Sequence, residues 1–70
     1  MGFRDMDLND EVRSRLRKNK ELGALGVDVV VRNGIVYLRG RVSRKSRDSV
    51  LKLARSVESV AAVVDEMSDT

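Results

Sequence analysis

The chain has 70 residues, of which 41% are hydrophobic and 36% charged, and its 14 Lys+Arg and 11 Asp+Glu give a formal net charge of +3. A chain of this length forms one small domain and leaves no room for a second domain or a deep cofactor cleft. It contains neither Cys nor His, which excludes disulfides, thiolate metal sites and an imidazole base. We therefore expect a non-catalytic binding module with no catalytic residues, no cofactor and no bound metal.

Targeting signals are missing from the sequence as given. The first residues contain no apolar core of signal-peptide length, and no apolar run approaches the ~20 residues of a membrane-spanning helix. This pattern predicts a soluble protein that is not transmembrane, with a cytoplasmic location as the default. If the domain has been cut from a longer chain, a periplasmic location or a larger exported protein is the alternative.

The first predicted element is an amphipathic helix over residues 7–18. Leu8, Val12 and Leu16 are spaced by four residues and form one apolar stripe along it. Residues 1–6, which precede this stripe, are expected to form a flexible N-terminus.

A β-hairpin follows, with strands at residues 27–32 and 35–42 joined by Asn33-Gly34. Asn-Gly between two β-rich runs is the strongest short hairpin signal, because both central residues of a type I′ turn need positive φ. The turn fixes the register and separates a valine-rich core face from a mixed, exposed face. Gly40 falls on the core face, where a missing side chain lets a helix approach. The exposed face carries Asp28, Val30, Arg32, Ile35, Tyr37, Arg39 and Arg41.

A second helix and a last strand complete the chain. Ser43 is a strong N-cap for a helix that runs to Ser56 or Val57. Residues 60–67 form the last strand. Apolar residues occupy adjacent positions in it, so the sequence does not decide which of its side chains point to the core. Residues 68–70 are expected to be frayed.

The element order is helix, strand, strand, helix, strand, which predicts an α+β fold. We expect a two-layer α/β sandwich in αββαβ order, with a three-stranded mixed sheet and two helices on one face. The strand–helix–strand unit requires a right-handed crossover between parallel strands. The first strand, residues 27–32, is predicted to lie in the middle of the sheet.

Two sequence motifs resemble a known family. Residues 27–42 contain a valine-rich strand, an Asn-Gly turn and the pattern V-x-L-x-G-x-V, and Ala54-Arg55-Ser56-Val57 opens a closing segment that continues to Asp65. This arrangement resembles the BON domain, a bacterial module named after osmotic-shock and nodulation proteins, over residues 7–67 as a single domain. Glu58-Ser59 departs from the family, whose members often carry Pro-Gly there. The resemblance implies a non-catalytic module that binds membrane surfaces, commonly anionic phospholipid, or that mediates assembly.

Charge is distributed unevenly along the chain. Residues 12–20 carry +5 and residues 32–55 carry +7, whereas residues 1–11 and 56–70 carry −3 and −4. The modest net charge therefore hides a strongly basic middle.

The first turn of the second predicted helix holds three cations, which oppose the helix dipole and lower stability there. Free N–H groups and serine hydroxyls in the same turn would suit an anion. We predict that a phosphate-bearing ligand or an anionic phospholipid surface binds at this turn together with the arginines of the exposed sheet face. The alternative is a solvated charged turn. The predicted site consists of Ser43, Arg44, Lys45, Ser46, Arg47, Arg32, Arg39 and Arg41.

The exposed sheet face allows a second function. Val30, Ile35 and Tyr37 form a small apolar centre that suits self-association, as in an assembly or scaffolding domain that forms a homo-oligomer. The alternative is an ordinary solvated face. Nucleic-acid binding is the least favoured function, because Phe3 and Tyr37 are the only aromatic residues and single-strand binders use several stacking platforms.

Overall fold

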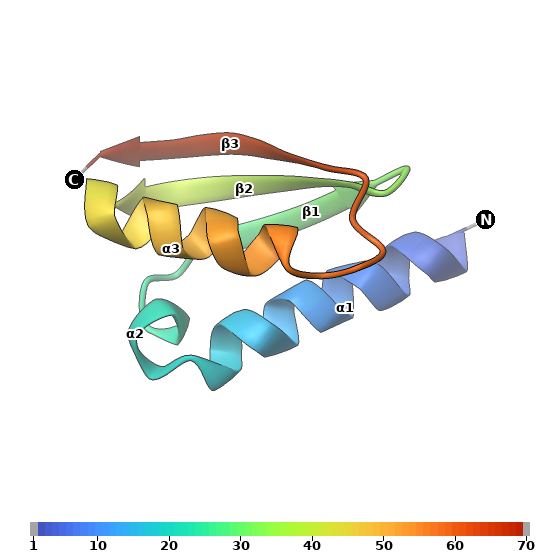
Figure 1. The fold of residues 1–70 in the computed structure, drawn as a ribbon, viewed down its shortest axis with the longest axis horizontal. Helices are drawn as coiled ribbons and strands as arrows, with labels where there is room; N and C mark the ends of the chain where they lie inside the picture. Colours follow the sequence, from blue (N-terminus) through green and yellow to red (C-terminus); the bar gives the residue numbers. More distant parts are fainter. Residues whose placement is uncertain (1, 70) are drawn as a thin grey trace.

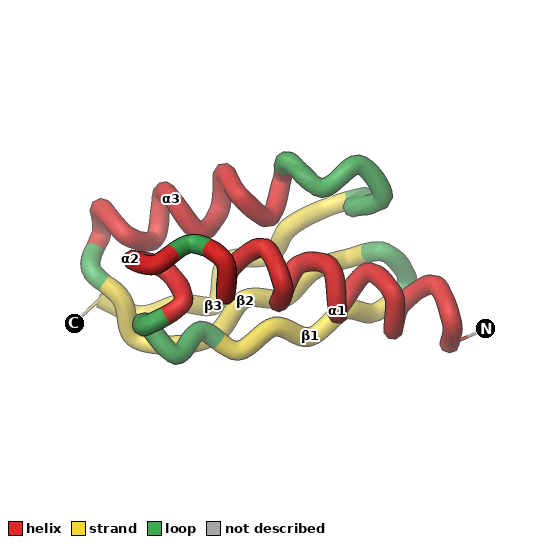
Figure 2. Tube along the Cα trace, turned by 90° about the horizontal axis from the view of Figure 1, so that it is seen from below, coloured by secondary structure: helices red, strands yellow, loops and turns green. Residues whose placement is uncertain are grey.

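Helices pack on one face of a three-stranded sheet and leave the other face open (Figures 1 and 2). The computed structural model describes the backbone of residues 2–69 and the side chains of residues 6–69. The predicted α+β class, the αββαβ order and the mixed sheet are confirmed, with one additional helical turn. The elements are α1 (Gly2–Lys18), α2 (Lys20–Gly23), β1 (Asp28–Arg32), β2 (Ile35–Val42), α3 (Arg44–Arg55) and β3 (Ala62–Asp69).

Helix α1 begins earlier than its apolar stripe. The stripe is buried as predicted, but the helix starts at Gly2, so most of the segment expected to be a flexible N-terminus is helical. Met1 lies outside the described residues. Asn19 then starts α2, because its side-chain oxygen accepts hydrogen bonds from the backbone N–H groups of Glu21 and Leu22, both at 3.1 Å. Leu22 is buried and closes one end of the core.

The hairpin has the predicted register, from Asp28 opposite Arg39 to Arg32 opposite Ile35. Asn33 and Gly34 adopt φ values of 53° and 79°, as a type I′ turn requires.

Gly40, with φ 148°, lies on the core face as predicted, but its neighbour is not a helix. An added Cβ would lie 3.5 Å from the Cα of Val27, so the chain entering β1 makes the close approach. The expectation of a helix there is wrong, because Gly26 and Val27 of the chain that enters β1 occupy that space.

The sheet order β1-β2-β3 places β2 in the middle, so the prediction of a central first strand is wrong. β1 pairs with β2 antiparallel, and β2 pairs with β3 parallel over eight residues, from Ile35 opposite Ala62 to Val42 opposite Asp69. A central β1 would separate β2 from β3. Each of these eight-residue strands would then pair only with the five-residue β1. The valine-rich β1 is instead a short edge strand, which limits edge-to-edge aggregation.

The pairing also settles the facing of β3. Val63 and Met67 point to the helices together with Asp65 and Asp69, whereas Val64 lies on the open face. Because Asp65 and Asp69 lie on the side that faces the helices, the sequence of β3 does not alternate between apolar and polar residues. The strand continues two residues past the predicted end, and Thr70 lies outside the described residues.

The core lies between the sheet and the helices, with α1 over β1 and α3 over β3 (Figure 2). Within residues 2–69 no helix is long and apolar enough to cross a bilayer. The buried side chains are Leu8, Val12, Leu16, Leu22, Val29, Val31, Val36, Leu38, Val42, Val50, Ala54, Val57 and Met67.

Candidate anion-binding site

The N-terminus of α3 is capped as predicted. The Oγ of Ser43 accepts a hydrogen bond from the backbone N–H of Ser46 at 3.3 Å, and the Oγ atoms of the two serines lie 3.1 Å apart. The first turn contains no acidic side chain. The hydroxyls of Ser43 and Ser46 are thus already hydrogen-bonded within the turn. The charge that a ligand would meet comes from the exposed cations Arg44 and Lys45.

Arg47 has a different role from the other two cations of this turn. Its Nη2 lies 2.9 Å from Oδ1 of Asp69 and its Nε lies 3.9 Å from Oδ2 of Asp65. Only 23% of its side chain is exposed. Arg47 thus ties α3 to β3, and two carboxylates of the chain itself compensate its charge.

The three arginines of the open face do not form one cluster. Arg32 and Arg41 lie at opposite ends of the face, about 20 Å apart along the strands. Arg39 lies between them, with its Nε 3.6 Å from Oε1 of Glu66. Of the three, Arg41 alone lies beside the N-terminus of α3, because Val42 and Ser43 follow it directly.

The fold brings further cations to the same end of the molecule. The last turn of α1, the short α2 and the first turn of α3 all lie at one end of the long axis (Figure 1), which measures 36 Å against 21 and 17 Å for the others. The excess of cations in residues 12–20 was the sequence signal for this arrangement. That this segment packs against α3 is visible only in the fold. We call this surface the basic end. It consists of Arg17, Lys18, Lys20, Arg41, Arg44 and Lys45, all exposed.

The opposite end of the long axis is acidic along its helical side. Asp7 and Asp10 lie in the first half of α1, and Glu58 lies in the loop between α3 and β3 (Figure 1). Charge is therefore separated along the molecule as well as along the sequence.

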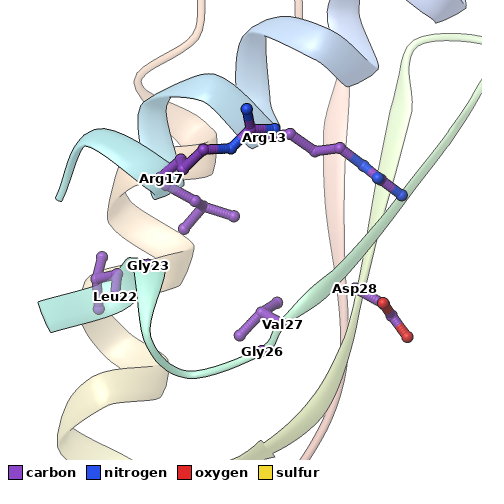
Figure 3. A pocket seen from close by; sticks show the side chains of 8 residues that line it. Arg13, Arg17, Leu22, Gly23, Gly26, Val27 and Asp28 are labelled. Atoms are coloured by element: carbon purple, nitrogen blue, oxygen red, sulfur yellow. The ribbon is translucent and has the colours of Figure 1, made fainter. Parts of the chain in front are cut away.

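A small groove opens beside the basic end, between α1 and the chain that enters β1 (Figure 3). Its lining combines the apolar side chains of Leu16, Leu22 and Val27 with the cationic side chains of Arg13 and Arg17. Its volume of about 170 Å³ lies below the ~300 Å³ at which small-molecule pockets begin. It does not add a ligand pocket to the basic end.

The predicted self-association residues lie together on the open face. Val30 and Tyr37 are cross-strand neighbours, and Ile35 precedes Tyr37 on the same face of β2. A shallow depression of about 290 Å³ is lined by Val30, Arg32, Tyr37, Arg39 and Glu66. In the described part of the chain, no group of three or more acidic, His or Cys side chains could hold a metal ion.

Comparison with known proteins agrees with the fold. The family model of the BON domain matches residues 4–68. A protein named 21 kDa hemolysin, from Actinobacillus pleuropneumoniae, is 33% identical to this chain over 60 residues, which are 86% of this chain and 31% of the relative. The chain thus spans about a third of the length of that curated relative.

Proposed function

This chain belongs to the BON domain family, and on that premise we propose that it binds anionic phospholipid surfaces through its basic end. BON domains are small non-catalytic modules that are commonly linked to membrane and phospholipid interaction. The family does not fix the ligand or the surface, so the proposal rests on the charges of this chain.

The convergence of cations at the basic end carries the proposal. Each Lys or Arg near an anionic membrane contributes about 1 kcal/mol of attraction, so several together suffice for reversible binding. The N–H groups at the start of α3 add a favourable dipole for phosphate. No ion pair within residues 6–69 engages Arg44 or Lys45, so both are available to headgroups.

This surface differs from the site predicted from the sequence. Arg41, Arg44 and Lys45 remain in it, while Arg39 and Arg47 are compensated by carboxylates within the chain. Their place is taken by the cations of α1 and α2.

Vesicle co-sedimentation tests the proposal. Wild-type protein should bind vesicles that contain phosphatidylglycerol, bind pure phosphatidylcholine vesicles weakly, and lose affinity as salt rises from about 50 to 200 mM, because salt screens exposed charges. The double variant Arg44→Glu/Lys45→Glu should bind anionic vesicles at least about tenfold more weakly, since it replaces two attractions by two repulsions.

The matched control is Lys52→Glu/Arg55→Glu, which makes the same change of charge in the last turn of the same helix. It should keep at least half of the wild-type affinity. Equal losses in the two variants would show that only net charge matters and would overturn the assignment of the basic end. If inorganic phosphate displaces the protein from anionic vesicles, the ligand is a free anion and not a lipid surface.

A further inference from the structure

Strand pairing arranges the side chains of the open face in rows that cross all three strands. The rows nearest the hairpin turn are uncovered by any other element (Figure 2). Counted from the turn, they are Arg32–Ile35–Ala62 (the first row), Val30–Tyr37–Val64 (the apolar row) and Asp28–Arg39–Glu66 (the charged row).

The apolar row contains two of the three exposed large hydrophobic residues within residues 6–69. Val30 is 39% exposed and Val64 is 36% exposed, one on each side of the half-buried Tyr37. Within residues 6–69 the third exposed large hydrophobic residue is Met6, which lies on α1 in the layer that covers the other face of the sheet. An apolar strip across a sheet is a surface that another sheet can cover.

The edges of the sheet are less accessible than its open face. At the β1 edge, Nη2 of Arg13 donates to the carbonyl oxygen of Val29 at 3.2 Å. At the β3 edge, the backbone N–H of Met67 donates to Oδ1 of Asp65 at 2.9 Å. Both contacts occupy backbone groups that an added strand would need, so association through the face is favoured over association through an edge.

We propose that two copies of this chain associate face to face through the open sheet, about a two-fold axis that crosses the strands at the apolar row. This axis places Arg32 of each copy opposite Asp28 of the other, which gives two ion pairs by symmetry. Neither residue forms an ion pair with another residue in the described part of the chain. Tyr37 meets Tyr37 of the second copy at the centre.

The charged row decides between the possible two-fold axes. An axis parallel to the strands would place Asp28 opposite Glu66 and Arg39 opposite Arg39 of the second copy. Both contacts bring like charges together, which costs affinity. The crossing axis places the aliphatic stem of Arg39 on Ile35 of the second copy and leaves the Arg39–Glu66 pair intact.

The size of the face sets the strength of the association. Three strands, spaced by about 4.8 Å and between about 16 and 26 Å long, present roughly 330 Å², less than half of the ~800 Å² per partner of a stable complex. The dimer is therefore weak, with a dissociation constant between about 10 μM and 1 mM. The basic end stays uncovered, so this association and membrane binding are independent.

Sedimentation equilibrium without lipid, from about 10 μM to 1 mM protein, tests the dimer over that range of affinities. The wild-type mass should rise from monomer toward dimer. Arg32→Asp and Asp28→Arg should each weaken association at least about fivefold, and the double exchange should restore it to within about twofold, because it reverses the same ion pair. Arg41→Asp, on the same face but beyond the overlap, is the matched control and should leave association unchanged.

A monomeric wild type at all concentrations would overturn the proposal, as would a double exchange no better than the two single variants. A control as weak as Arg32→Asp would overturn the stated axis. Val30→Ser provides a test that leaves every charge in place, and it should also weaken association. Since lipid is absent throughout, none of these results depends on membrane binding.

Discussion

Arg47 shows how the same residue type can serve the fold or a ligand. Its sequence position groups it with Arg44 and Lys45, but the fold directs it onto Asp65 and Asp69 of β3. The sequence did not reveal this pairing, because the two aspartates lie 18 and 22 residues further along and their facing was ambiguous. Position in a helical turn predicts a residue's neighbours within the helix, whereas its partners across the layers depend on strand register.

Removal of the Arg47 guanidinium should weaken the contact between α3 and β3. We expect Arg47→Met to lower the free energy of unfolding by about 1 kcal/mol, because the aspartates are partly exposed and a surface pair contributes little more. Urea unfolding provides the measurement. Arg44→Met, an exposed cation of the same turn, should change stability by less than about 0.5 kcal/mol. A loss of equal size in both variants would contradict a specific role for Arg47.

At the scale of elements, the hairpin was predictable to single-residue register and the sheet order was not. Asn33-Gly34 prescribes its own geometry, so the pairing of residues 28–32 with 35–39 follows from local chemistry. The order of strands depends on where the β2–α3–β3 connection places β3, and a parallel crossover is compatible with a central β1 as well. β1 was predicted to be the central strand, but it lies at the edge of the sheet, and Val30 is exposed on the open face.

The first turn of α3 is a place where binding and stability should oppose each other. Arg44 and Lys45 repel the positive end of the helix dipole, and acidic residues there would be favourable by 0.3–1 kcal/mol each, or roughly 1 kcal/mol together. We therefore expect Arg44→Glu/Lys45→Glu to be more stable than the wild type in urea while it loses affinity for anionic vesicles. Lys52→Glu/Arg55→Glu should be less stable, since the same change opposes the dipole at the other end of the helix. A charge-reversed first turn that is less stable would show that the cations serve the fold.

At the scale of the whole molecule, the main outcome of folding is the meeting of two basic segments that are separate in the sequence. The excess of cations in residues 12–20 and in residues 32–55 was visible from composition. Their common location was not, because it requires α1 and α2 to run along the sheet toward the end of the molecule at which α3 starts (Figure 1). The site predicted from the sequence therefore included α3 and the open face but omitted α1 and α2.

If the basic end is one surface, its two halves should contribute to the same binding event. Lys18→Glu/Lys20→Glu should weaken binding to phosphatidylglycerol vesicles about as much as Arg44→Glu/Lys45→Glu, because each exchange reverses two exposed cations facing the same membrane. The quadruple variant should bind phosphatidylglycerol vesicles no better than phosphatidylcholine vesicles, and its affinity should lose most of its dependence on salt. Wild-type affinity in the Lys18→Glu/Lys20→Glu variant would restrict the site to α3 and leave the cations of α1 and α2 as a solvated helix end.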